Sequence, residues 1–201
     1  MDRRQIIHTI AVTSLLPAFA QKPAPENANK RGPMINPNYL FLGGKHGAWK
    51  VTRMIPYRGT ALETVERVDV VNGEFNAQPA DTSWMLRGFT SNVRYATGAE
   101  VKTLKARQEG LNRPESTCAA LIPIKKTAAW WDLPQDERRA IFEETSHHTA
   151  IGLDYLPAIA RRLHHSRDLG EPFDFITWFE FAPKHQEVFD ELLLRLRATK
   201  E

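Results

Sequence analysis

The apolar residues of this chain recur in two successive stretches, residues 37–114 and 115–201. In the first stretch, short apolar runs are bounded by Gly and Pro, which is typical of strands. A Thr cap at Thr97 precedes apolar residues at helical spacing, which indicates a helix start. The first stretch is therefore predicted to contain strands at residues 39–44, 48–57 and 83–91 and a helix over residues 97–108.

The second stretch repeats this order with more strongly apolar segments. Residues 118–124 form an almost continuous apolar run, which predicts a strand buried on both faces. Residues 173–181, FDFITWFEF, place alternate side chains on opposite faces of a strand. Caps and apolar spacing predict helices over residues 128–148, 155–165 and 183–199, the second of them capped by Asp154. Strands followed by helices with this alternation predict an α+β fold in which helices pack on an antiparallel sheet.

Composition limits the classes of protein to consider. With 201 residues, 42% of them hydrophobic, the chain can bury one sizeable core or two small fused ones. The net charge of +3 arises from intermixed basic and acidic residues, which argues against a nucleic-acid surface. The single cysteine, Cys118, lies in an apolar run and excludes both a disulfide framework and a cysteine-based zinc site.

Residues 1–20 have the pattern of a removable export signal. Arg3 and Arg4 precede an apolar stretch, which ends in the small-x-small sequence at residues 18–20. The stretch is too short and too polar to span a bilayer, which requires about 20 apolar residues. We therefore expect a periplasmic protein whose signal is cleaved near Ala20, by either the general or the twin-arginine route. Residues 21–36 have the composition of a flexible linker.

Several motifs lie close together between residues 121 and 180. They are the strand IPIKK followed by a Trp pair, a His thirteen positions before an Arg, the sequence LHHS, and the strand DFITWFE. Together they resemble the haem-binding half of the chlorite dismutase family in its short form. The resemblance extends more weakly from about residue 39 to residue 201. It implies two fused ferredoxin-like halves, antiparallel sheets with helices outside, in a fold of the dimeric α+β barrel type.

The resemblance implies that His148 is the axial ligand of a haem iron and that Arg161 lies on the opposite side of the haem. On one straight helix these two residues would be about 20 Å apart, so a single site requires the chain to reverse between them. A helix break near Gly152 is expected to provide this reversal. His147 is the rival ligand, and the spacing to Arg161 favours His148. Without the resemblance, a His at this position is more typical of a helix cap.

Further roles follow from the same resemblance, and some of these residues also have an alternative role. Lys126 would pair with a haem propionate, and Trp130 would lie at the haem edge. Glu180 would accept a hydrogen bond from the ligand histidine, or be a charge at a strand end. Gln108 would hydrogen-bond the arginine, or be solvated. Leu156 and Leu163 would form the apolar walls of the haem site, although packing in a hydrophobic core would also explain both leucines.

The resemblance implies a haem b enzyme that decomposes chlorite to chloride and O2 and that forms a homodimer. Oxygen is transferred to the iron, and the O–O bond forms with a hypochlorite that Arg161 retains. The alternatives are a coproheme decarboxylase-like enzyme, for which Tyr155 could be the reacting tyrosine, a peroxidase-like enzyme, and a haem-binding sensor without turnover.

Overall fold

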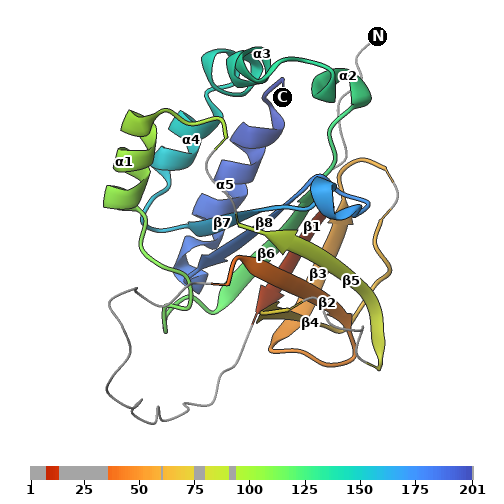
Figure 1. The fold of residues 1–201 in the computed structure, drawn as a ribbon. Helices are drawn as coiled ribbons and strands as arrows, with labels where there is room; N and C mark the ends of the chain where they lie inside the picture. Colours follow the sequence, from red (N-terminus) through yellow and green to blue (C-terminus); the bar gives the residue numbers. More distant parts are fainter. Residues whose placement is uncertain (1–7, 14–35, 60, 75–79, 91–93, 201) are drawn as a thin grey trace, which may run out of the picture.

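The computed structural model describes residues 8–13, 36–59, 61–74, 80–90 and 94–200. Within these residues, eight strands form a closed antiparallel barrel in the order β1-β3-β4-β2-β5-β7-β8-β6 (Figure 1). The strands are β1 (His8–Thr13), β2 (Asn38–Gly44), β3 (Trp49–Pro56), β4 (Arg67–Asn72), β5 (Thr82–Phe89), β6 (Cys118–Ile124), β7 (Ala160–His165) and β8 (Phe175–Phe181).

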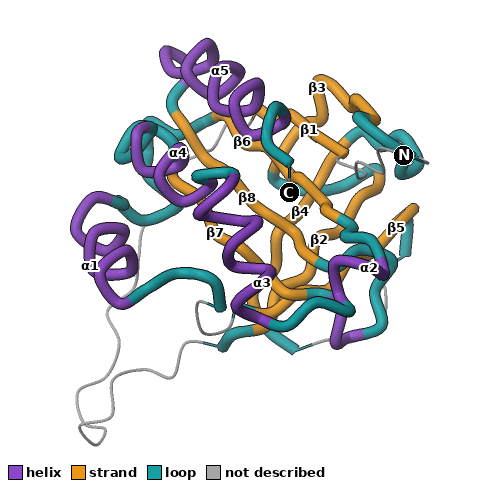
Figure 2. Tube along the Cα trace, turned by 90° about the horizontal axis from the view of Figure 1, so that it is seen from above, coloured by secondary structure: helices purple, strands orange, loops and turns teal. Residues whose placement is uncertain are grey.

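The helices lie outside the barrel, and most of them gather over β6, β7 and β8 (Figure 2). They are α1 (Gly98–Arg107), α2 (Ala128–Trp131), α3 (Gln135–Arg139), α4 (His148–Asp154) and α5 (Gln186–Arg197), with a π-helix at Ala140–Thr145 and 3-10 turns at Arg167–Leu169 and Pro183–His185. The predicted α+β class, with an antiparallel sheet and helices packed outside it, is confirmed.

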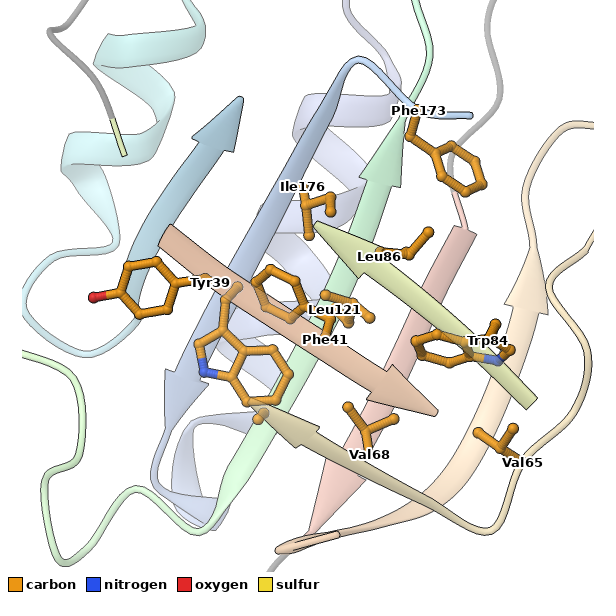
Figure 3. Packing of buried hydrophobic residues seen from close by; sticks show 11 residues of the cluster. Tyr39, Phe41, Val65, Val68, Trp84, Leu86, Leu121, Phe173 and Ile176 are labelled. Carbon is orange, nitrogen blue, oxygen red and sulfur yellow. The ribbon is translucent and has the colours of Figure 1, made fainter. Parts of the chain in front are cut away.

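Two apolar cores use the two faces of the same strands. Inside the barrel, Phe41, Leu121 and Trp178 are almost fully buried in one cluster, part of which Figure 3 shows. On the outer face, Phe179 and Phe181 pack against Phe189 of α5. Every residue of β8 is therefore buried, as is nearly all of β6. This agrees with the prediction that residues 118–124 are covered on both faces.

Local signals fix the ends of α1 as predicted. The Thr97 hydroxyl accepts from the Glu100 backbone N–H, and the Glu100 carboxylate accepts from the Thr97 N–H, which together form a capping box. Residue Gln108 caps the other end through its backbone N–H to the Leu104 carbonyl. These contacts within α1 determine where the helix begins and ends, but they do not determine its position relative to the barrel.

The prediction of a helix over residues 155–165 is wrong. Residues 160–165 form β7, and all six pair with β8, from Ala160 opposite Glu180 to His165 opposite Phe175. A six-residue segment has too few turns to stabilise a helix by itself, so pairing with a buried strand decides its conformation. The helix predicted over residues 128–148 is instead divided into α2, α3, the π-helix and the first residue of α4.

The N-terminal segment has two competing assignments. Residues 8–13 form β1, which pairs with β3 and β6 and closes the barrel between them. The same residues lie within the predicted export signal, and a segment that is cleaved off could not remain as β1. The predicted linker at 21–36 lies outside the described residues, except for its last position. None of the helices in the described part of the chain is both long and apolar enough to span a membrane.

Candidate active site

A pocket of about 620 Å³ lies between the outer face of β6, β7 and β8 and the helices that cover it. Its volume is in the range of sites that hold a cofactor-sized ligand. Because strand residues alternate between faces, the strands contribute every second side chain to the pocket, with Arg162 of β7 as an additional lining residue. These side chains are Ile122, Ile124, Arg161, Leu163, His165, Phe175, Thr177 and Phe179.

The charged side chains of this pocket are all basic. The described lining residues include seven arginines and lysines and contain neither Asp nor Glu. An apolar pocket with several cations at its walls favours an anionic ligand that has a large apolar body. The seven are Arg58, Arg94, Lys105, Lys126, Arg161, Arg162 and Arg197.

His148 enters the pocket at the first turn of α4. The preceding residue, His147, has a left-handed backbone with φ of 52°, which separates the π-helix from α4. The carboxylate of Glu143 accepts from the backbone N–H groups of Thr149 (2.6 Å) and Ala150 (3.2 Å), so it caps α4 from the preceding helix. The imidazole of His148 stacks on Phe142 with ring centroids 4.3 Å apart. These contacts fix both the backbone and the ring of His148 at the pocket wall.

Arg161 reaches the same pocket from β7, where it pairs with Phe179 of β8. Burial lowers the pKa of its guanidinium to about 10. A part of the side chain is still exposed, and this part faces the pocket. Among the described residues, no ion pair with a carboxylate is found for Arg161, which leaves its charge available to a ligand. His148 and Arg161 therefore line one pocket, as predicted, although the chain reverses after α4 and not at Gly152.

Lys126 and Trp130 lie together at another part of the wall. The backbone N–H of Lys126 donates to Asp174 Oδ2 (2.5 Å), and the Lys126 ammonium lies 5.3 Å from the centre of the Trp130 ring. Thr127 caps the short helix that carries Trp130. The indole Nε1 of Trp130 is buried, and no acceptor for it is found among the described residues. A buried donor without a partner is costly, and here it lies on a residue of the pocket wall.

Gln108 and Leu163 also line the pocket, as predicted. Gln108 is exposed at the end of α1, while Leu163 is 46% exposed despite its place in a strand. An apolar side chain with this exposure inside a pocket offers a contact surface for a ligand.

Three predicted site residues are not part of the pocket lining. Glu180 lies on the barrel-interior face of β8, where its carboxylate accepts from Trp178 Nε1 (2.8 Å) and the Asn112 backbone N–H (2.5 Å). The pocket uses the opposite face of β8, so a contact between Glu180 and His148 does not fit this strand register. Leu156 lies in the turn after α4. The hydroxyl of Tyr155 donates to Glu191 of α5 (3.0 Å).

His165 also lines the pocket, although no role in the site was predicted for it or for His164. Both are buried, and burial lowers the pKa of each imidazole to about 4. His164 points into the barrel, with Nδ1 3.1 Å from the Ile176 carbonyl oxygen, and His165 faces the pocket. The alternation of a strand would have separated the two residues, but the segment had been predicted as a helix.

Known proteins resemble this chain in sequence and fold. The family model described as chlorite dismutase matches residues 59–201. The chlorite dismutase of Ideonella dechloratans is 37% identical over 83 residues, which are 41% of this chain and 27% of that protein, so the match spans about a quarter of that relative. Dimeric chlorite dismutase from Nitrobacter winogradskyi has a TM-score of 0.73 and 50% identity, with 80% of this chain and 90% of that chain covered.

A mutant of the chlorite dismutase from Candidatus Nitrospira defluvii matches with a TM-score of 0.50 and 34% identity, over 60% of this chain and 48% of that one. The family model covers well over half of the chain and includes His148, Arg161, Lys126 and Trp130, which line one pocket. This chain belongs to the chlorite dismutase family.

Proposed function

We propose that this protein binds haem b in the pocket and decomposes chlorite to chloride and O2. The observation that carries the proposal is one pocket that combines a histidine, an arginine without a carboxylate partner, six further cations and many apolar side chains, with no acidic residue among its described lining. Haem b has a flat apolar body with two propionates and an iron that needs an axial ligand. The residues present fit each of these parts.

His148, in the first turn of α4, would hold the haem iron through a ring nitrogen. The bound haem would supply the oxygen-transfer chemistry. Phe142 limits rotation of the imidazole by stacking, and Glu143 holds the helix that carries it. Lys126 would pair with one propionate, and the unpartnered Trp130 Nε1 offers a further donor close to it.

Arg161 would attract the chlorite anion and retain hypochlorite near the haem. Because burial lowers the pKa of this guanidinium only to about 10, it remains positively charged at neutral pH. Its charge would be lost as the pH rises through about 10, so anion capture should weaken in that direction. Gln108 and Leu163 lie in the same pocket and would limit where the anion can sit.

The test is oxygen release from haem-loaded protein after addition of chlorite, followed with an oxygen electrode. His148→Ala should lose haem or its normal spectrum, and Arg161→Ala should retain haem, lose most of the O2 yield and release hypochlorite to a chlorination dye. His147→Asn is the matched control, because Asn tolerates the left-handed backbone at this position and the side chain is exposed. Absence of O2 from protein with a normal haem spectrum would refute the proposal.

We further propose that the protein is an exported homodimer. The dimer is supported by the Nitrobacter relative, which is described as dimeric. Export is supported by the signal pattern of residues 1–20. Light scattering tests the first statement. N-terminal sequencing of the protein from its native host tests the second, and a mature N-terminus before residue 8 would show that β1 is retained.

A further inference from the structure

Gly152 occupies the third position from the end of α4 and is buried. Its φ is not among the positive values of this structure, so the backbone there is accessible to any residue. The usual conformational reason for a glycine is therefore missing. Alanine would be the better helix former at this position.

What Gly152 provides is space for Arg161. A Cβ atom built on Gly152 would lie within 3.0 Å of both terminal nitrogens and the central carbon of the Arg161 guanidinium. These three atoms are its nearest neighbours, and none of them belongs to the backbone. An added methyl group would therefore displace the end of one flexible side chain and leave the surrounding fold in place.

The location of Gly152 relates this contact to the ligand histidine. Gly152 follows His148 by four positions, so the two residues lie on the same side of α4, about 6 Å apart along its axis. Arg161 lines the pocket from β7, and its guanidinium lies against Gly152 of α4. The guanidinium thus lies against the helix one turn from His148.

We propose that Gly152 is a positioning residue, which by lacking a side chain lets the Arg161 guanidinium lie against α4 and so determines where the pocket holds a small anion. The inference rests on the proposed function only for the identity of the anion. Whether the missing side chain of Gly152 makes room for the Arg161 guanidinium can be tested without haem and without turnover.

The first test is a thermal double-mutant cycle of Gly152→Ala and Arg161→Ala in the full chain. In the Arg161→Ala background, Gly152→Ala should raise Tm by about 2–4 °C, because alanine then gains helix propensity without a clash. With Arg161 present, the same change should leave Tm unchanged or lower it. Gly98→Ala is the control, since a Cβ at Gly98 in α1 meets nothing within 4 Å, and its effect should be equal in both backgrounds. Equal Tm shifts for Gly152→Ala in both backgrounds would overturn the proposal.

The second test is nitrite binding to the haem-loaded protein, read from the Soret band. Gly152→Ala and Arg161→Ala should each weaken nitrite binding by about tenfold or more, which is the usual effect of losing one charge-assisted hydrogen bond. The double variant should bind no more weakly than Arg161→Ala. If Arg161→Ala weakens nitrite binding and Gly152→Ala does not, the proposed role of Gly152 is overturned. If Arg161→Ala had no effect, the anion role of Arg161 in the proposed function would fail, while the thermal cycle would still decide whether Gly152 positions that side chain.

Discussion

The ion pair between Glu100 and Arg139 should stabilise the folded protein, because it joins α1 to α3 beside the pocket. Two parallel hydrogen bonds connect them, from Nη1 of Arg139 to Oε2 of Glu100 and from Nη2 to Oε1, each 2.8 Å long. The same guanidinium also donates to the carbonyl of Tyr95. Replacing Glu100 by Gln removes the charge but retains an oxygen that can accept from the Thr97 N–H in the capping box.

The size of the effect follows from the pKa of Glu100. Hydrogen bonds from Arg139, and secondarily from Thr97, lower this pKa from its ordinary value of 4.5 to about 2, although burial opposes the shift. At about 1.4 kcal/mol per pH unit, the full difference would be worth about 3 kcal/mol. Solvent screens a partly exposed pair, so we expect Glu100→Gln to lower the free energy of unfolding by about 1–2 kcal/mol at neutral pH.

The effect should also depend on pH with a defined sign. A carboxylate whose pKa is lower in the folded state stabilises the fold above the unfolded pKa, and this stabilisation is lost as the pH falls from about 4.5 toward 2. The difference between wild type and Glu100→Gln in urea unfolding should therefore be constant above about pH 5.5 and smaller at pH 3.5.

Glu144→Gln provides the matched control. Glu144 contacts the same arginine, with 3.2 Å between Oε1 and Nε, but its side chain is 57% exposed. Its replacement should change the free energy of unfolding by less than about 0.5 kcal/mol. Equal losses for the two variants, or a Glu100→Gln loss that does not shrink at pH 3.5, would refute this account of the ion pair.

Three further predictions concern the cores. Leu121→Ala, at a fully buried position inside the barrel, should cost about 2–5 kcal/mol in urea unfolding, whereas Leu194→Ala, at a position 68% exposed on α5, should cost less than about 0.5 kcal/mol. Because burial lowers the pKa values of His164 and His165 from 6.5 to about 4, stability should fall as the pH decreases from 6.5 to 4, and His165→Gln should reduce this fall; a pH-independent stability in this range would contradict it. Burial raises the pKa of the Cys118 thiol, so the native protein should react with a thiol reagent far more slowly than the urea-unfolded chain, and equal rates would be inconsistent with the buried position.

Short-range patterns in the sequence determined several elements of this protein. Thr97 and Glu100 form a capping box that needs only residues of one helix turn, so the start of α1 was predictable. The alternation of residues 173–181 and the apolar run at residues 118–124 likewise identified β8 and β6. The motifs around His148, Arg161, Lys126 and Trp130 identified the family and residues that do line one pocket.

Only the tertiary structure decided which face of each strand meets the pocket. The alternation of β8 separated Glu180 from Phe179 correctly, but whether Glu180 faced the pocket or the barrel interior depended on the packing of α5 against Phe179 and Phe181. The segment at residues 160–165 is too short to determine its own conformation, and its six pairs with β8 made it a strand.

Sequence patterns also could not predict the basic lining of the pocket or the role of Gly152. The seven cations extend from Arg58 to Arg197, and they converge only because the barrel closes. Gly152 had suggested a helix break, yet it lies within α4 and leaves room for a side chain from another strand. Sequence patterns report interactions between near neighbours in the chain, whereas these features depend on atoms that folding brings together from distant positions.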